Sequence, residues 1–346
     1  MATTKAILSY PWRSSKNSKS NETNICPKLN KTSQLSEAVA AVAKNELRED
    51  KSSREQSLQQ LKEWIAKNRD IESCRTDDLF LLRFLRVKKF SVPMAQQMLL
   101  KYLNLRKSFP HFTLKLDFLS PTVQEIIDAG YIFPSPIKDK HGRRVVFYIA
   151  SNFDPYKYSN ADQARVHFIT YETLLEDQEN QVMGLTHAGD LKGAQAAHVS
   201  LWTVSEFARI VKWGEHSIPM RHKQVHVLNM PSAIRYVYEF SKTRISAKIK
   251  DRIMIHQDLS AMHEHLDKAC LPAEYGGTIP IREMVQLWKK ELADKRNVLL
   301  ALDCMKLHSD SGIITSKNPG QDCNNNNTKV AATESITGSF RKLEID

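Results

Sequence analysis

Apolar residues recur with helical spacing in the first patterned part of the chain. Leu58, Leu61 and Ile65 fall on one helical face, and a second stripe of this kind runs through residues 93–109. Stripes of this width need a partner surface, so neighbouring helices are expected to pack against one another. The pattern predicts a small helical domain over residues 51–112.

Beyond this domain, short apolar runs alternate with helical patterns. The runs bounded by turn residues are typical of strands, and they cover residues 131–136, 143–150, 183–190, 225–228 and 252–256. Helical patterns cover residues 121–129, 161–181, 204–213, 231–241, 260–270 and 281–292. This alternation predicts an α/β domain with a mainly parallel sheet over residues 113–300.

Both ends of the chain lack such periodicity. Residues 1–50 and 301–346 are rich in Ser, Asn and Thr, so we expect mostly disordered tails, with a weak helical patch at 35–47. The N-terminus has no apolar region suited to a signal peptide. No run approaches the roughly 20 apolar residues of a membrane span. We expect a cytoplasmic protein that touches membranes only transiently.

The stretch 218–256 combines a strand, an amphipathic helix and many positive charges. Basic residues flank the helix 231–241 on both sides, and they are Arg221, Lys223, Lys242, Arg244, Lys248, Lys250 and Arg252. An amphipathic helix between two cationic edges suits an anionic membrane surface. Taken alone, a core strand and helix with a solvated basic face explains the stretch equally well.

The net charge favours an anionic partner. Lys and Arg total 50 against 39 Asp and Glu, which leaves a net charge of +11. The sequence contains no zinc-finger spacing, no aromatic-rich RNA-binding run and no basic zipper. We therefore expect lipid, and not nucleic acid, as the partner.

Sequence signals for catalysis and metal binding are missing. With 11 Gly in 346 residues there is no GxGxxG, no GxxxxGK[ST] and no GxSxG motif. His263 and His265 point to nearly opposite sides of a helix and would not share an ion. The five cysteines form no CxxC pair. We expect no enzyme, no catalytic residue, no cofactor and no metal.

Five motifs occur together in a fixed order. They are LLRFLRVKKF (81–90), DLKG (190–193), VHVLNMP (225–231), AKIKDRIMIH (247–256) and LPAEYGG (271–277). Over residues 55–300 this combination resembles the CRAL-TRIO lipid-binding family, which includes tocopherol transfer proteins, cellular retinaldehyde-binding protein and the clavesins. The resemblance implies an N-terminal helical domain and an α/β domain whose sheet floors a hydrophobic pocket under a mobile gate helix.

Residue roles follow from the resemblance, position by position. It implies phosphoinositide-binding cations at Lys88, Arg221, Lys223, Lys248 and Arg252. It implies a gate helix in which Ile234, Val237 and Phe240 are candidates to enter the bilayer. The candidate pocket residues are His167, Phe168, Tyr171, Leu174, Leu185, His187, Val225 and Val227. His167 and Tyr171 stand where a tocopherol-binding relative has serines, which argues against tocopherol itself.

Buried polar groups leave alternatives open. His187 interrupts a strand that is apolar in relatives, so it either polarises the cavity or faces a buried partner. Arg83 and Arg86 are expected to pair with acids between the two domains. We interpret Glu172 and Glu176 as a solvated acidic helix face.

Two functions fit these expectations. The first is a monomeric carrier of one hydrophobic molecule, such as a tocopherol, a retinoid or another lipid. It would dock to phosphoinositide-containing endosomal or other acidic membranes. The second is a clavesin-like, phosphoinositide-binding endosomal trafficking adaptor whose pocket is regulatory.

Overall fold

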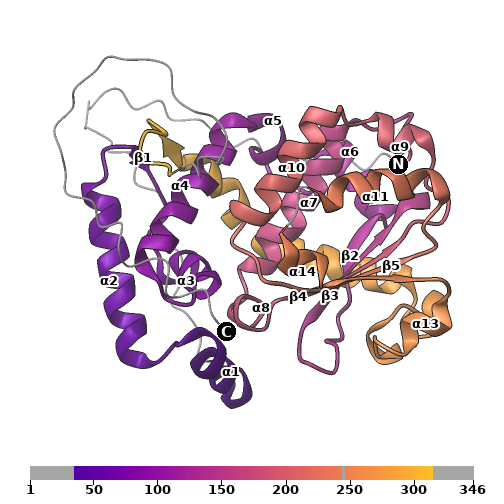
Figure 1. The fold of residues 1–346 in the computed structure, drawn as a ribbon, viewed down its shortest axis with the longest axis horizontal. Helices are drawn as coiled ribbons and strands as arrows, with labels where there is room; N and C mark the ends of the chain where they lie inside the picture. Colours follow the sequence, from indigo (N-terminus) through magenta and orange to yellow (C-terminus); the bar gives the residue numbers. More distant parts are fainter. Residues whose placement is uncertain (1–34, 244–245, 315–346) are drawn as a thin grey trace, which may run out of the picture. The chain divides into compact units, whose positions relative to one another are not determined.

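The computed structural model describes residues 35–243 and 246–314 (Figure 1). Most of the two tails predicted to be disordered, residues 1–34 and 315–346, lies outside the described residues. Within the predicted N-terminal tail, helix α1 (Glu37–Leu47) forms at the weak helical patch. Strand β7 (Lys306–Leu307) pairs with β1 (Ile71–Ser73), so regular structure continues into the predicted C-terminal tail.

Helices dominate the N-terminal part. After α1 come α2 (Lys51–Lys67), α3 (Asp78–Val87), α4 (Val92–Ser108) and α5 (Pro110–Thr113). Asp77 accepts a hydrogen bond from the amide of Phe80 at 3.1 Å and so fixes the start of α3. Phe80, Phe84 and Tyr102 meet edge to face, and they form the aromatic centre of this helical layer.

Five strands form the main sheet. They are β2 (Ile132–Pro134), β3 (Arg144–Ile149), β4 (Leu185–Asp190), β5 (His222–Leu228) and β6 (Ile253–His256). Their order in space follows the chain, β2-β3-β4-β5-β6. β2 is antiparallel to β3 and the other neighbours are parallel, which confirms the predicted mainly parallel sheet.

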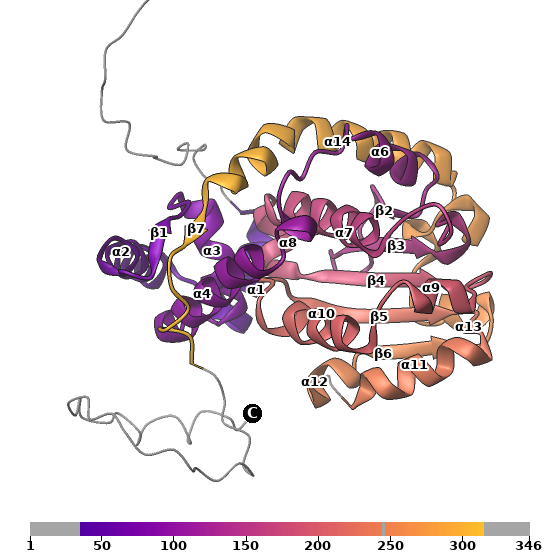
Figure 2. The ribbon, with the colours of Figure 1, turned by 90° about the horizontal axis from the view of Figure 1, so that it is seen from above.

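The helices of this part precede, connect and follow the strands. They are α6 (Pro121–Asp128), α7 (Asn160–Leu175), α8 (Gln178–Met183), α9 (Ala196–Ser200), α10 (Val204–His216), α11 (Ser232–Lys242), α12 (Ala247–Lys250), α13 (Leu259–His263) and α14 (Ile281–Ala301). Crossovers between parallel strands are right-handed, and here they all step in one direction, which places their helices on one face of the sheet. Figures 1 and 2 show α7, α10 and α11 over that face.

Two predicted helices are shorter in the structure. The helical pattern at 161–181 is divided between α7 and α8, because Asp177 accepts a hydrogen bond from the amide of Glu179 at 2.7 Å and starts a new helix. The predicted helix 260–270 is divided as well: α13 ends at His263, and a separate 3-10 turn covers Lys268–Cys270. Conversely, α10 continues past Gly214.

Buried ion pairs join the N-terminal helices to α7 and the segment after it. Arg83 on α3 lies 2.7 Å from Glu172 and 2.5 Å from Glu176, and Arg86 lies 2.7 Å from Glu49. The predicted pairing with acids between the two domains is confirmed for Arg83. Arg86 pairs with Glu49, ahead of α2, and contacts the α/β domain through the side-chain oxygens of Gln178 and Gln181. The solvated acidic face predicted for Glu172 and Glu176 is wrong, because α3 covers that face of α7 and both carboxylates are buried.

Candidate functional site

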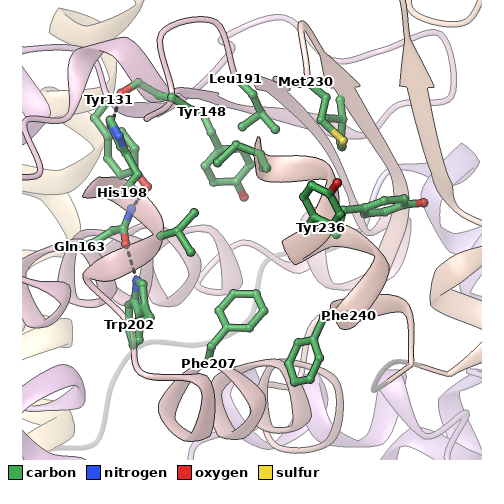
Figure 3. Close-up of a pocket in the computed structure, with 16 residues that line it drawn as sticks. Tyr131, Tyr148, Gln163, Leu191, His198, Trp202, Phe207, Met230, Tyr236 and Phe240 are labelled. Atoms are coloured by element: carbon green, nitrogen blue, oxygen red, sulfur yellow. Dashed lines mark hydrogen bonds between the residues drawn. The ribbon is translucent and has the colours of Figure 1, made fainter. Parts of the chain in front are cut away.

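Two adjoining cavities lie between the sheet and its covering helices. The larger has a volume of about 600 Å³ and is bounded by β3, β5, α9 and α11 (Figure 3). The smaller, of about 340 Å³, lies between α7 and α10. Gln163, Trp202 and Phe207 belong to both walls. Among the described residues no Asp, Glu, Lys or Arg lines either cavity, which is the character of a site for an apolar ligand.

Half of the predicted pocket residues lie in these walls. Val227 lines the larger cavity, and His167, Phe168 and Tyr171 line the smaller one. The rest of the larger wall is mostly apolar or aromatic, and sequence reasoning missed Tyr131, Tyr148, Leu191, His198, Val199, Trp202, Phe207 and Met230. These residues come from segments far apart in the chain, so no local pattern marks them as one site.

The other predicted pocket residues do not contribute to either lining. Leu174 and Leu185 are fully buried and belong to the core. Val225 is half-buried on β5, outside both walls. His187 is buried behind the wall, where its Nδ1 lies 2.7 Å from the hydroxyl of Tyr148.

A chain of hydrogen bonds runs through the wall. It consists of Tyr131 hydroxyl to His167 Nε2 (2.9 Å), His167 Nδ1 to Tyr171 hydroxyl (3.3 Å), Tyr171 to Tyr148 (2.6 Å), Tyr148 to His187 Nδ1 (2.7 Å) and His187 Nε2 to His222 Nδ1 (2.9 Å). The sequence left open whether His187 polarises the cavity or faces a buried partner. The structure gives it two half-buried hydrogen-bond partners: Tyr148, which lines the larger cavity, and His222, which lines the smaller one.

Burial keeps this chain uncharged. It lowers the pKa of His167 and of His222 to about 4, and it lowers the pKa of His187 well below its ordinary value. Burial also raises the pKa of Tyr171 to about 12 and that of Tyr148 well above its ordinary range. At neutral pH the chain is therefore a row of neutral donors and acceptors.

An irregularity at the start of β5 turns His222 toward the cavities. Consecutive residues of β4 pair with His222 and with Gln224, so Lys223 is an extra residue in β5. Because side chains alternate along a strand, this extra residue places His222 on the same face as Val227. Strict alternation would have placed the two on opposite faces. The predicted strand 225–228 begins after His222, so the sequence pattern does not assign this residue to the pocket.

Helix α11 carries the predicted gate residues and borders the larger cavity. Ile234 and Phe240 line that cavity, and the side chain of Val237 lies outside the described residues. Tyr236 stands at the cavity's edge and is 82% exposed (Figure 3). In this structure two of the three gate candidates line the cavity, and among the described side chains of α11 Tyr236 is a large hydrophobic one that is mostly exposed.

The five predicted phosphoinositide-binding cations repel one another in a connected set, which we call the basic cluster: Lys88, Arg221, Lys223, Lys248 and Arg252. They come from the ends of α3, β5, α12 and β6. Burial is the largest cause that lowers the pKa of Lys88 and of Lys248. Repulsion between cations lowers these pKa values further, because Lys248 acts on Lys88 and Arg252 acts on Lys248. Such repulsion places the charges within electrostatic reach of one another.

A carboxylate from α1 contacts two members of the basic cluster. Glu46 Oε2 lies 2.6 Å from Arg221 Nη2 and 2.8 Å from Lys223 Nζ. Burial raises the pKa of Glu46, but hydrogen bonds and charge from Lys223 and Arg221 outweigh it and hold the value at about 2. Apolar residues of α1 pack on Val182 and keep the helix in place. An external anion would compete with Glu46 for these two cations.

His263 on α13 belongs to no metal-binding group of side chains among the described residues, and α14, the longest helix described, is too polar to cross a bilayer. His263 Nε2 lies 2.9 Å from the carbonyl of Tyr275, and the part of the chain that the structure describes holds no group of side chains suited to a metal ion. Within residues 35–243 and 246–314, no helix has the length and apolar character that a bilayer crossing needs.

Comparison with known proteins gives two family matches. Residues 128–277 match the model described as CRAL/TRIO domain, and residues 50–123 match the one described as Pinta-like, UBA domain. The human protein named alpha-tocopherol transfer protein-like is 30% identical over 246 residues, covering 70% of this chain and 71% of that protein. Clavesin-1 of Xenopus laevis is 31% identical over 240 residues, covering 69% and 72%. Clavesin-2 of Rattus norvegicus is 28% identical over 261 residues, covering 75% and 80%.

Proposed function

The chain belongs to the CRAL-TRIO family, and from this membership and its apolar cavities we propose that it binds and transfers one lipid molecule without catalysis. The observation that carries the proposal is the pair of adjoining cavities, the larger of them bordered by α11, whose walls hold no Asp, Glu, Lys or Arg among the described residues. A site of this kind suits an oily ligand, because each buried CH₂ group contributes about 0.8 kcal/mol. Relatives named for alpha-tocopherol transfer support the same reading.

Reversible transfer needs a cavity that opens at a membrane and not in water. A bilayer offers an apolar ligand about the same stabilisation as an apolar pocket, so exchange between the two is nearly thermoneutral. Exposure of the pocket to water is what has to be avoided, and a lid that opens against lipid avoids it. Helix α11 is the candidate lid, because Ile234 and Phe240 contribute to the cavity wall while Tyr236 faces outward.

The basic cluster is the candidate docking surface. It gathers five cations near the start of β5, and Tyr236 on the following helix offers an aromatic group of the kind that partitions to membrane interfaces. Each basic residue near an anionic surface contributes only about 1 kcal/mol to binding. Docking through this cluster is therefore expected to be reversible and sensitive to salt. We propose a cytoplasmic monomer that visits phosphoinositide-containing endosomal or other acidic membranes.

A liposome assay tests both halves of this proposal. A fluorescent lipid is moved from donor to acceptor vesicles with and without phosphatidylinositol bisphosphate in the acceptor. Lys223→Ala with Lys248→Ala removes two cations, worth about 2 kcal/mol or roughly thirtyfold in docking at low salt. Lys268→Ala with Lys290→Ala, which changes two exposed lysines outside the cluster, is the matched control. Transfer that responds neither to the phosphoinositide nor to the first pair would contradict the docking half.

A second function remains a candidate, a phosphoinositide-dependent trafficking adaptor with a regulatory pocket. It is favoured by the position of the basic cluster, none of whose five cations lines either cavity, so docking does not require a transported ligand. The same assay separates the two. A carrier moves the fluorescent lipid between vesicles, whereas an adaptor binds phosphoinositide vesicles and leaves the transfer rate at its protein-free value.

A further inference from the structure

Two tyrosines of the hydrogen-bonded chain, Tyr131 and Tyr148, also line the larger cavity (Figure 3). We propose that these two tyrosines form a polar subsite for a lipid that carries one neutral oxygen, as a hydroxyl or a carbonyl group. The inference rests on the lipid binding proposed above and narrows the ligand to a chemical class. It takes its support from how the hydrogens of the wall can be arranged.

The amide of Gln163 fixes one end of the arrangement. Trp202 Nε1 donates to Gln163 Oε1 at 2.7 Å, so the amide nitrogen of Gln163 is the atom that faces Tyr131, at 3.0 Å (Figure 3). Tyr131 therefore accepts a hydrogen bond from Gln163. Its own hydrogen is directed either to His167 Nε2 or into the larger cavity.

The neutral chain can order its hydrogens in two directions. Each phenol and each neutral imidazole contributes one hydrogen. In the first order the hydrogens run from Tyr131 to His222, and Tyr148 keeps a lone pair that can accept from a ligand hydroxyl. In the second order they run from His222 to Tyr131, whose hydroxyl hydrogen is then free to donate to a ligand carbonyl or hydroxyl. In both orders every hydrogen bond of the chain has one donor and one acceptor. Each order also leaves one tyrosine hydroxyl able to bond to a ligand oxygen.

An anionic head group does not match this subsite. Among the described residues no cation lines the larger cavity, and burial keeps His167, His187 and His222 neutral at the pH of the cell. A carboxylate or phosphate would be buried there without a counter-charge, which is strongly unfavourable. A plain hydrocarbon fits the walls but makes no hydrogen bond to the two tyrosines. A neutral oxygen uses both the apolar walls and the polar subsite.

The test compares four probes on the full chain. Each carries a pyrene group and an alkyl chain of one length, and they end in a hydroxyl, a methyl ketone, a carboxylate or a methyl group. Binding is titrated by pyrene fluorescence at neutral pH. The hydroxyl and ketone probes are expected to bind about fivefold more tightly than the methyl probe, the gain typical of one neutral hydrogen bond. The carboxylate probe is expected to bind at least about tenfold more weakly than the hydroxyl probe.

Conservative variants assign the gain to the two oxygens. Tyr131→Phe with Tyr148→Phe keeps both rings and is expected to remove the advantage of the hydroxyl probe over the methyl probe. Tyr158→Phe is the control, because it removes a hydroxyl bonded to Glu125 at 3.2 Å outside both cavity walls. A melting curve of each variant verifies folding, and the probe series on the unaltered chain needs no variant.

The outcomes separate the subsite from lipid binding as such. Equal affinity of the unaltered chain for the hydroxyl and methyl probes overturns the subsite while leaving lipid binding intact. Tightest binding of the carboxylate probe overturns it as well. Failure of all four probes to bind overturns the proposed lipid binding together with the subsite.

Discussion

Replacing Glu46 with Gln is expected to strengthen docking to anionic vesicles. Glu46 lies 2.6 Å from Arg221 and 2.8 Å from Lys223. Its pKa of about 2 keeps it ionised at any pH at which vesicles are used. The five cations of the basic cluster and this carboxylate together carry a net charge of +4, and the variant raises that charge to +5.

The size of the effect follows from the charge. One unit of charge near an anionic surface is worth about 1 kcal/mol, which is roughly a fivefold change in Kd. Glu46→Lys changes the charge by two units and is expected to give about 2 kcal/mol, or roughly thirtyfold. Both gains decrease as salt is added, because the Debye length shortens to about 8 Å at physiological ionic strength.

Vesicle sedimentation with and without phosphatidylinositol bisphosphate measures the effect. Glu37→Gln is the matched control, because it removes the same charge from the same helix, α1, nine residues away from Glu46. Glu46→Gln is expected to bind about fivefold more tightly than this control at low salt. Binding by Glu46→Gln that equals the control, or is weaker, would refute a role for the basic cluster in docking.

Three further predictions concern stability and the lid. Arg83→Ala leaves the buried Glu172 without its ion-pair partner, while Glu176 keeps Arg75, and is expected to cost about 3–5 kcal/mol in urea unfolding. Lys62→Ala, which breaks a half-exposed pair with Asp78, is expected to cost under about 1 kcal/mol. Burial lowers the pKa values of His167, His222 and His226 to about 4. Below about pH 6.5 the unfolded chain therefore binds more protons than the folded chain, and the free energy of unfolding decreases as the pH is lowered. Between about pH 7 and 5.5 the loss is about 1 kcal/mol per histidine, and unchanged unfolding over that range would count against buried neutral imidazoles. Tyr236→Ser is expected to weaken vesicle binding by about 1.5 kcal/mol, or roughly tenfold. Tyr156→Ser, at an equally exposed position (81%) outside α11, is expected to leave vesicle binding unchanged. Equal effects of the two variants would argue against insertion of α11 into the membrane.

The sheet could be predicted from the sequence because its strands are short apolar runs separated by turn residues. That signal is local, and β2 to β6 fall within a few residues of their predicted places. The break between α7 and α8 was missed because the apolar pattern continues across it, while the capping bond of Asp177 depends on one residue. The pairing of β7 with β1 joins segments far apart in the chain, and two-residue strands carry no pattern of their own.

Burial of polar groups was the part that local patterns could not supply. Glu172 and Glu176 have the spacing of a solvated helix face, and only the position of α3 makes them buried partners of Arg83. His222 enters the cavity wall through an extra residue in β5, which a strict alternation of side chains does not predict. Tyr131 directly precedes β2 and Tyr148 lies in β3, so their shared position in the cavity wall depends on how these two strands pair.

Lipid binding is tested most sharply by the small molecules that the purified protein contains. The full chain is purified without detergent or denaturant, weighed by native mass spectrometry, and extracted with organic solvent for identification of any small molecule. We expect one lipid per chain, with a neutral hydroxyl or carbonyl oxygen, that is lost on denaturation. A folded protein whose native mass equals that of the polypeptide alone, and whose extract contains no stoichiometric lipid, would contradict this expectation.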